Sequence, residues 1–294
     1  MKLRDIALAS CPPVLWGTSY ALAKPATGHF PPIFMMAIVY ALSALLLLKS
    51  VRHRRTPHWT LLAIATFGGA LQSSLIFTGI AGLPAATAIL VVQAQVPFAV
   101  LCAWVIGQER LNMRRLAGIA VAAAGIAVIA GAPEAVRSLG SLLLVLLGTL
   151  SWGIAQGLTR RLGKDSGRTM TAIITLYAAP ELLLASLFLE SHQLDRLMTA
   201  SLSDWLAILI LAIGGFVLAY SIWYGLLTRH RVDQVAPFIL LMPLIGVLAS
   251  VILLGETLSR NALIGGVIIV LGLAIIVIDP ASRRGTTNHP AAHR

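Results

Sequence analysis

One stretch of this chain occurs twice, and that repetition constrains the fold more than any other feature. Each copy carries a proline within an apolar run, then a glutamate, and then two glycines, over Pro84–Gly125 and Val232–Gly272. At a constant offset of 147 residues, Glu109, Gly118 and Gly125 correspond to Glu256, Gly265 and Gly272. Because a repeated unit decides the architecture before any local pattern does, we interpret the chain as two copies of one unit.

A second pair of positions extends the repeat towards the start of each copy. Trp16 and Lys24 in the first copy correspond to Trp152 and Arg160 in the second, at an offset of 136 residues. The difference between the two offsets shows that the copies differ in length between these positions. We therefore expect a first unit over residues 1–132, a second over residues 133–280, and a short tail over residues 281–294.

Apolar runs of membrane-spanning length fill both units. Hydrophobic residues make up 58% of the chain and charged residues 11%, against about 25% charged in a soluble domain. Such a composition cannot cover a solvated surface, whereas about 20 consecutive apolar residues can cross a bilayer as a helix. We expect ten spans, over Ile6–Ala23, Ile33–Leu48, Trp59–Gly82, Ala85–Ile106, Leu116–Gly131, Leu139–Thr159, Thr169–Leu189, Trp205–Thr228, Val235–Leu254 and Ala262–Ile278.

The positions of the basic residues indicate how these spans are oriented. With ten spans and a cytoplasmic N-terminus, the cytoplasmic segments hold all of the 22 Lys and Arg residues except Lys24, Arg137, Arg196 and Arg260. The positive-inside rule requires such an asymmetry, and a missed or extra helix would destroy it. Both termini are therefore expected to be cytoplasmic. The net charge of +11 is spread over short loops that face anionic lipid, which argues against a nucleic-acid partner.

The odd number of helices in each unit determines how the two units are related. After five crossings the second unit enters the membrane from the side opposite to the first. The sequence therefore predicts an all-α integral membrane protein of ten transmembrane helices, built as two inverted five-helix repeats. Inverted repeats of this kind are typical of secondary transporters, whose substrate site lies near the bilayer midplane between the repeats.

The repeated segments also resemble a known family. The Trp-Gly pairs in the first helix of each unit, GLPAATAILVVQAQVPF with IGQERL, and VAPFILLMPLIGVLAS with GETL are similar to the drug/metabolite transporter superfamily, EamA family. Within it, the chain looks most similar to bacterial exporters of cysteine, O-acetylserine and other amino acids. The resemblance implies a multi-pass protein of the inner membrane that exports a solute through a central cavity built from both repeats.

Polar and aromatic side chains inside the expected spans are the candidate substrate contacts. Because the spans hold no Asp, Lys or Arg, the cavity suits small zwitterionic or neutral solutes. An amino group can lie over a Trp or Tyr face, and a carboxylate can meet a helix N-terminus exposed at a proline break. We expect substrate contacts from Trp16, Ser19, Tyr20, Gln72, Gln93, Gln95, Trp152, Gln156, Tyr220, Trp223 and Tyr224, and helix breaks at Pro12-Pro13, Pro97, Pro237 and Pro243.

Some of these residues have a structural interpretation as well. An intramembrane glutamine can simply bond a neighbouring helix, so we expect this role for one of Gln93 and Gln95 and a cavity role for the other. Trp16 and Trp152 could equally be packing residues. Glu109 and Glu256 are expected to cap helices or fix loops, because they lie at the ends of expected spans.

Glu181 is the only acidic residue well inside an expected span. A carboxylate there is costly, which makes it a candidate for proton coupling. It also follows Pro180, so it can instead bond backbone groups freed by a helix break. Since no second titratable group in the spans could pass a proton on, we favour facilitated export driven by the gradient of the substrate.

The sequence thus predicts a membrane transporter that exports small metabolites, above all amino acids or their derivatives, by alternating access. The alternatives are a broad-specificity drug, cation or sugar-type transporter, and a proton-coupled antiporter that uses Glu181. No HExxH, GxSxG or P-loop motif is present, so we expect neither an enzyme nor a cofactor or metal. The expected partners are a small-molecule substrate and the lipid bilayer, and the expected assembly is a monomer or a weak homodimer.

The charge asymmetry makes one direct prediction about topology. Single cysteines introduced at Arg54 and at Gln193, in a variant without Cys11 and Cys102, should react with a membrane-impermeant maleimide from opposite sides of oriented vesicles. Labelling of both cysteines from the same side would contradict the ten-span topology.

Overall fold

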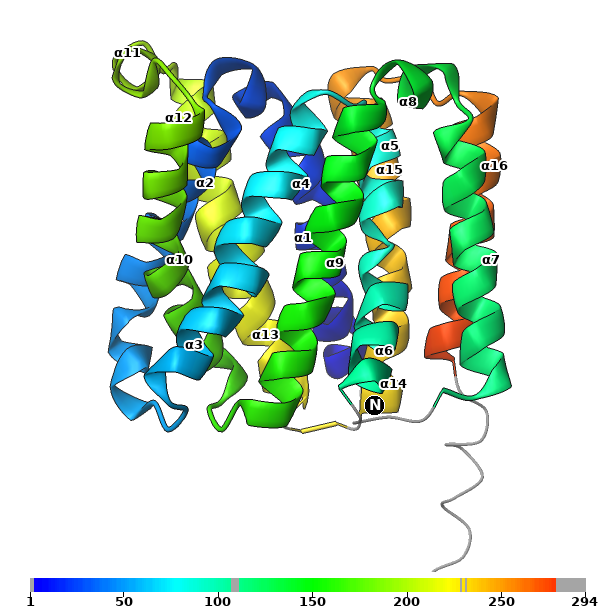
Figure 1. Cartoon of the computed structure of the whole chain (residues 1–294), viewed down its shortest axis with the longest axis horizontal. Coiled ribbons are helices and arrows are strands. Elements are labelled where there is room, and N and C mark those ends of the chain that lie inside the picture. The colour runs from blue at the N-terminus through cyan, green and yellow to red at the C-terminus, as the bar shows by residue number, and fades with distance from the viewer. Residues whose placement is uncertain (1–2, 107–110, 228, 231, 279–294) are drawn as a thin grey trace, which may run out of the picture.

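The computed structural model describes residues 3–106, 111–227, 229–230 and 232–278, and in these ranges all regular secondary structure is helical (Figure 1). Ten helical segments are long and apolar enough to cross a membrane. This confirms the expected all-α membrane fold and the expected number of spans. The spans cover Leu3–His29, Pro32–Arg52, His58–Ala81, Ala85–Val105, Met113–Ala130, Leu139–Leu162, Gly167–Leu189, Leu202–Trp223, Ala236–Leu254 and Arg260–Val277.

Several spans consist of more than one helix. In the first half the elements are α1 (Leu3–His29), α2 (Pro32–Leu47), η1 (Leu48–His53), α3 (His58–Ala65), η2 (Thr66–Ala70), α4 (Leu71–Ala81), α5 (Ala85–Val92), α6 (Gln95–Val105) and α7 (Met113–Ala130). In the second half they are α8 (Pro133–Arg137), α9 (Leu139–Leu162), α10 (Gly167–Leu189), α11 (Gln193–Met198), α12 (Leu202–Leu209), η3 (Ile210–Leu218), α13 (Ala219–Leu227), α14 (Val232–Val235), η4 (Ala236–Leu240), α15 (Leu241–Leu254) and α16 (Arg260–Val277).

Glycines bring α7 and α16 into direct backbone contact. A Cβ atom on Gly125 would lie 2.7 Å from the carbonyl oxygen of Gly265, and a Cβ on Gly265 would lie 2.6 Å from that of Gly125. Gly118 and Gly272 make the same reciprocal contact, at 2.9 and 2.8 Å. Small residues permit such close approach between membrane helices. Gly118 therefore packs against Gly272, which is the repeat counterpart of Gly125. In the same way, Gly125 packs against Gly265, the repeat counterpart of Gly118.

A second pair of contacts follows the same rule. A Cβ on Gly17 in α1 would lie 3.0 Å from the amide nitrogen of Gly246 in α15. A Cβ on Gly153 in α9 would lie 3.1 Å from the amide nitrogen of Ala99 in α6. Gly153 is the repeat counterpart of Gly17, and Ala99 stands 147 residues before Gly246. The first helix of each half thus packs against the fourth span of the other half.

Two glutamates cap helices that begin far away in the sequence. Glu256 accepts hydrogen bonds from the amides of Ala85 and Ala86 at 2.8 and 2.9 Å, at the start of α5. Glu190 accepts from the amides of Ile33 and Phe34 at the same distances, at the start of α2. The expected structural role of Glu256 is confirmed, whereas Glu109 lies outside the described residues.

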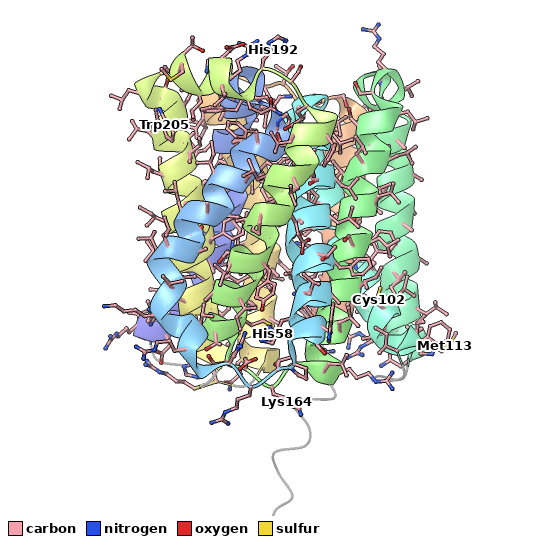
Figure 2. All side chains as sticks on the ribbon, turned by 60° about the vertical axis from the view of Figure 1, so that its left-hand side comes forward. His58, Cys102, Met113, Lys164, His192 and Trp205 are labelled. Carbon is pink, nitrogen blue, oxygen red and sulfur yellow. The ribbon has the colours of Figure 1, made fainter. Side chains whose placement is uncertain are left out.

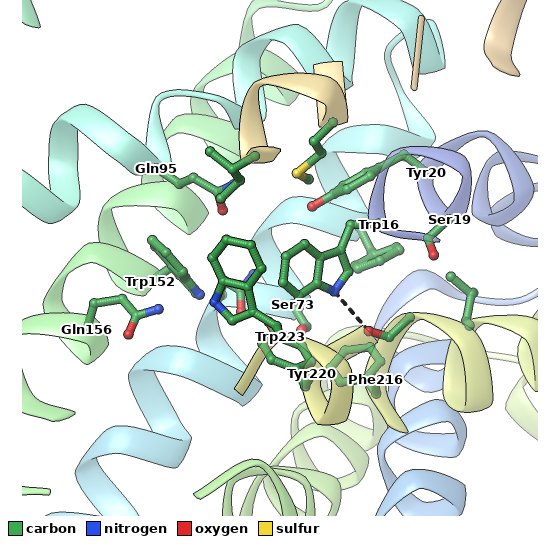
Figure 3. Close-up of a pocket in the computed structure, with 16 residues that line it drawn as sticks. Trp16, Ser19, Tyr20, Ser73, Gln95, Trp152, Gln156, Phe216, Tyr220 and Trp223 are labelled. Atoms are coloured by element: carbon green, nitrogen blue, oxygen red, sulfur yellow. Dashed lines mark hydrogen bonds between the residues drawn. The ribbon is translucent and has the colours of Figure 1, made fainter. Parts of the chain in front are cut away.

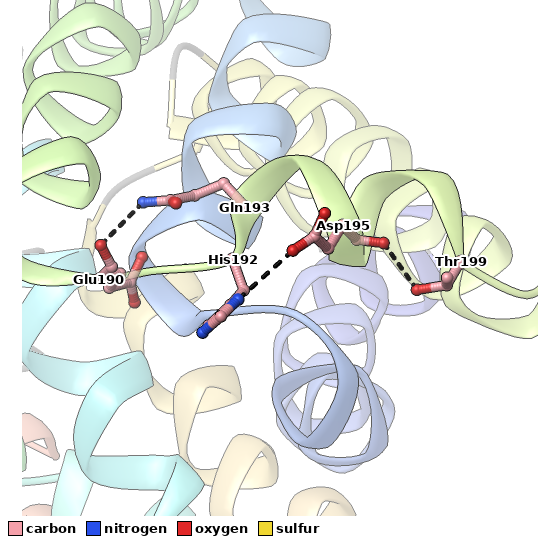
Figure 4. A network of polar contacts seen from close by, with 5 residues as sticks. All are labelled: Glu190, His192, Gln193, Asp195 and Thr199. Atoms are coloured by element: carbon pink, nitrogen blue, oxygen red, sulfur yellow. Dashed lines mark hydrogen bonds and ion pairs between the residues drawn. The ribbon is translucent and has the colours of Figure 1, made fainter.

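The turn after α10 holds Glu190 in place. Gln193 donates to the Glu190 carbonyl oxygen at 3.1 Å, and His192 adopts a left-handed conformation with φ of 65° (Figure 4). Ser186 donates to the Glu190 carboxylate at 2.8 Å. The loop that crosses this end of the bundle is therefore tied both to α10 and to the start of α2.

Helix α1 runs unbroken through Pro12 and Pro13, so the expected break there is wrong. Both prolines are buried, as is Ala9 one turn earlier. Membrane helices tolerate proline where packing and neighbouring groups compensate for the lost backbone bond. The packing of α1 therefore overrides the local preference of its prolines.

The outer surface matches a bilayer environment. Side chains such as Phe188, Leu189, Val105 and Ile252 are more than half exposed along the sides of the bundle. Nitrogen-bearing tips gather at the two ends, near His58 and Lys164 at one end and His192 at the other (Figure 2). Figure 1 shows the start of α1 and the end of α16 at one end of the bundle.

The contact between α7 and α16 predicts that the same substitution, glycine to alanine, destabilises the protein at one position and not at another. Gly125→Ala should lower the free energy of unfolding by about 1–3 kcal/mol, because the added methyl group overlaps the backbone of α16. Gly140→Ala in α9 is the matched control, since nothing lies within 4 Å of its Cβ position. Thermal unfolding in detergent measures both variants. Equal stability of the two variants would contradict the close packing.

Candidate functional site

A cavity of about 190 Å³ lies between the two halves of the chain (Figure 3). Six spans contribute to its walls, through α1, α4, α6, α9, the η3–α13 segment and the η4–α15 segment. Aromatic, amide and hydroxyl groups dominate the lining. The residues are Trp16, Ser19, Tyr20, Gln72, Ser73, Phe77, Gln95, Trp152, Gln156, Leu211, Gly215, Phe216, Tyr220, Trp223, Ile239 and Met242.

The structure brings nine of the eleven expected contact residues together at this cavity. They come from both halves of the chain, which are far apart in the sequence. These residues are Trp16, Ser19, Tyr20, Gln72, Gln95, Trp152, Gln156, Tyr220 and Trp223. The side chain of Tyr224 lies outside the described part of the chain.

Gln93 is the exception, and its expected cavity role is wrong in this structure. Its side chain is fully buried away from the cavity, and its Nε2 donates to the carbonyl oxygen of Ile89 at 3.1 Å. Gln93 and Gln95 stand two positions apart and point in different directions. Gln95 faces the cavity, whereas Gln93 bonds a carbonyl group of its own helix and not the neighbouring helix that was expected.

Pro97 explains why Gln95 stands at a helix start. A proline ring clashes with the carbonyl group four residues earlier, which here belongs to Gln93. Helix α5 ends at Val92, and α6 begins at Gln95. In the corresponding segment of the second half, Pro237 lies within η4, and Pro243 lies in the first turn of α15, which follows η4 directly. Regular α-helical structure is thus absent just before Pro97 and Pro243 and around Pro237.

One wall of the cavity is a cluster of three aromatic rings. The ring centroid of Trp16 lies 5.0 Å from that of Tyr220 and 5.6 Å from that of Trp223, both edge-to-face. Edge-to-face pairs are favourable because the positive ring edge meets the negative face. The indole N–H of Trp16 donates to the carbonyl oxygen of Gly215 at 2.9 Å, which locks Trp16 onto η3.

The opposite wall presents polar groups that form no hydrogen bond with any other described residue. The Gln95 side chain is 8% exposed, and among the described residues none forms a hydrogen bond with its carboxamide. The indole N–H of Trp152 and the carboxamide of Gln156, both in α9, also form no hydrogen bond with another described residue. Figure 3 shows these three side chains on the side of the cavity away from Trp16 and Tyr20.

Charged side chains lie outside the cavity lining of the described residues. Glu181 accepts a hydrogen bond from Thr66 at 3.0 Å, which ties α10 to the start of η2. Lys24 donates to the carbonyl oxygens of Ile80 and Ala81 at 2.8 Å, at the end of α4. Both residues therefore serve contacts between helices in this structure.

Sequence reasoning missed several lining residues. Phe216 precedes Tyr220 by four positions and Trp223 by seven, so helical spacing could have placed it on the same face. Ser73 bonds the hydroxyl of Tyr40 at 2.7 Å, a contact that no sequence pattern indicates. No sequence pattern distinguishes Gly215, Ile239 and Met242 as cavity residues. Gly215 lies in η3 and Ile239 in η4, and Met242 lies in α15 directly after η4.

The family model for EamA-like transporters matches residues 4–131 and residues 139–278. The chain belongs to the EamA-like transporter family. It is therefore a membrane transporter rather than an enzyme. A solved crystal structure has the same fold, with a TM-score of 0.66 at 22% identity, and the match covers 98% of this chain and 100% of that chain.

Several relatives match this transporter over nearly their whole length. A protein of Salmonella typhimurium named probable amino-acid metabolite efflux pump is 32% identical, covering 97% of this chain and 98% of the relative. A protein of Escherichia coli K12 with the same name is 29% identical, with 94% and 96% covered. The inner membrane transporter YedA of Escherichia coli is 25% identical, with 90% and 88% covered. Together with its ten spans, these matches identify the chain as a multi-pass inner-membrane protein.

The geometry predicts that Trp16→Ala and Trp152→Ala each reduce transport by about tenfold or more, since each removes a large side chain from the cavity wall. Trp104→Ala in α6 is the matched control, because this tryptophan is 51% exposed on the outer surface. Uptake of labelled substrate into proteoliposomes measures all three variants, at equal amounts of folded protein. Transport at the parent rate by both cavity variants would exclude this cavity as the route.

Proposed function

We propose that this transporter exports amino acids or closely related metabolites through the central cavity by alternating access. The uncharged aromatic and amide lining carries the proposal, because it can bind a zwitterion without an opposing fixed charge. The cavity of about 190 Å³ is also smaller than the roughly 300–1,000 Å³ typical of sites for drug-sized ligands. Two relatives named probable amino-acid metabolite efflux pumps support the same substrate class.

The reciprocal glycine contacts support an inverted repeat as the basis of alternating access. In a pair related by two-fold symmetry, a contact between position i and position j is matched by one between j and i. Gly118 and Gly125 meet Gly272 and Gly265 in this way. In transporters with inverted repeats, one repeat rocks against the other around a fixed site. Both termini are then cytoplasmic, as the basic loops indicate.

The energy source that we propose is the gradient of the substrate itself. Coupled pumps hold chains of Asp, Glu or His within their spans, whereas Glu181 bonds Thr66 and does not line the cavity. A proton bound at Glu181 would therefore have no direct contact with a substrate in the cavity.

Counterflow tests the transport proposal. Proteoliposomes preloaded with an unlabelled neutral amino acid should transiently accumulate the labelled form, because the outward flux of unlabelled solute drives the exchange. Liposomes without protein are the control for leakage. A transporter that gave no accumulation with any neutral amino acid would not have the proposed function.

A pH gradient tests the proposed energy source. Substrate-loaded proteoliposomes with a gradient of about two pH units, worth roughly 2.7 kcal/mol per proton, should still equalise the substrate across the membrane. The Glu181→Gln variant should behave in the same way. Accumulation beyond equality that is lost in Glu181→Gln would establish proton coupling through this residue instead.

A further inference from the structure

We propose that the cavity holds its substrate in one orientation, with a carboxylate against Gln95 and Trp152 and an ammonium group against the rings of Trp16, Tyr220 and Trp223. The inference rests on the proposed function and narrows it. The substrates are α-amino acids in which both charged groups are free and the side chain carries no charge. Solutes that lack either charged group fill only one of the two subsites.

The Gln95 wall favours an anion for two independent reasons. First, Gln95 is more than nine-tenths buried, its side chain lines the cavity, and its carboxamide NH₂ group can donate but has no acceptor among the described residues. Second, Gln95 is the first residue of α6, an 11-residue helix whose N-cap Ala94 provides no side-chain cap. The N-terminal end of a helix carries partial positive charge. A ligand carboxylate at this place would accept the hydrogen bond that the protein leaves unmade.

Trp152 strengthens the same subsite, because its indole nitrogen can only donate. Here the two copies of the repeat differ. Trp16, at the matching position, already donates to the Gly215 carbonyl oxygen at 2.9 Å, so it offers the ligand only its ring. The N–H of Trp152 has no acceptor among the described residues, although the side chain lines the cavity. The two tryptophans at the repeated position thus have different roles, since Trp16 provides an aromatic ring on one wall and Trp152 a hydrogen-bond donor on the other.

The aromatic wall favours a cation. The faces of Trp and Tyr rings attract an ammonium group, and Trp does so most strongly. Trp16 is packed edge-to-face against Tyr220 and Trp223, whose ring planes lie at 60° and 62° to the plane of its indole. The same faces repel a carboxylate. A zwitterion in the reverse orientation would therefore place its carboxylate against the ring faces and leave the indole N–H of Trp152 without an acceptor.

A first experiment selects the probe. The purified full-length transporter in proteoliposomes is screened by counterflow with alanine, serine, cysteine, valine, leucine, methionine and phenylalanine. The amino acid with the largest signal becomes the labelled ligand. Its decarboxylated amine and its deaminated acid serve as competitors in equilibrium binding to the purified protein. Absence of counterflow with all seven amino acids would refute the proposed function, and the orientation with it.

The variants are expected to separate the two subsites. Gln95→Leu and Trp152→Phe should each weaken binding of the amino acid by about tenfold or more, as expected for the loss of a hydrogen bond to a charged group. Binding of the amine should stay within about twofold, because its contacts are unchanged. Trp16→Leu should instead weaken the amine and the amino acid while sparing the acid. Trp104→Phe, on the outer surface of α6, is the matched control and should leave the affinities for the amino acid, the amine and the acid unchanged.

Binding of one competitor also shows that each variant is folded. The amine should keep its affinity for the Gln95 and Trp152 variants, and the acid should keep its affinity for the Trp16 variant. If Trp16→Leu does not fold, Trp223→Leu tests the same subsite. Gln95→Glu introduces a negative charge at this subsite, and should abolish binding of the amino acid while retaining the amine. The orientation is wrong if Gln95→Leu and Trp152→Phe weaken the amine as much as the amino acid. It is also wrong if they weaken neither, even where counterflow has established amino-acid transport.

Discussion

The interior of a bilayer offers no water to backbone polar groups, and the irregular parts of this structure depend on that constraint. In two of the irregular segments, η2 and η3, a side chain from another helix bonds a backbone carbonyl group. Ser151 donates to the carbonyl oxygen of Phe67 in η2 at 2.6 Å, and Trp16 donates to that of Gly215 in η3 at 2.9 Å. These two irregular turns lie in the third span of each half, and both bonds join them to the first helix of the opposite half. The cavity is therefore built where the backbone is least regular and most dependent on side chains.

The glycine contacts and the irregular segments together indicate which parts of the bundle can move relative to one another. Glycine contacts fasten α7 to α16 over two pairs of residues, where any added atom would overlap backbone. Among the spans that line the cavity, α1 is fastened to α15 through Gly17, and α9 to α6 through Gly153. The irregular segments η2 and η3 are instead joined to neighbouring helices by individual hydrogen bonds. π-type turns within helices are frequent at functional sites. We expect each pair of fastened helices to remain together, and the change of tilt to occur at the irregular segments η2, η3 and η4.

Much of this arrangement could be predicted from the sequence because it depends on spacing. The spans follow from the length of the apolar runs, and the Trp16 and Trp152 positions follow from the repeat. The role of Glu256 follows from its place at the end of a span. Other features depend on tertiary packing and leave no local pattern. These include the continuity of α1 through Pro12 and Pro13, the choice between Gln93 and Gln95, and the different bonding of Trp16 and Trp152. The bonding of the two tryptophans is the most informative of these features, because the repeat predicts equivalent roles for Trp16 and Trp152 and the structure shows different ones.

Distances across the two ends of the bundle test alternating access most directly. Spin labels at Leu194 and Val136 report on one end, and labels at Trp59 and Met113 report on the other; all four side chains are more than half exposed. Pulsed electron–electron distance measurements in proteoliposomes would follow each pair with and without a transported amino acid. The account predicts that the substrate shifts the two distance distributions in opposite directions, so that one end narrows as the other widens. Shifts in the same direction at both ends, or no shift at either end of a protein that still gives counterflow, would contradict it.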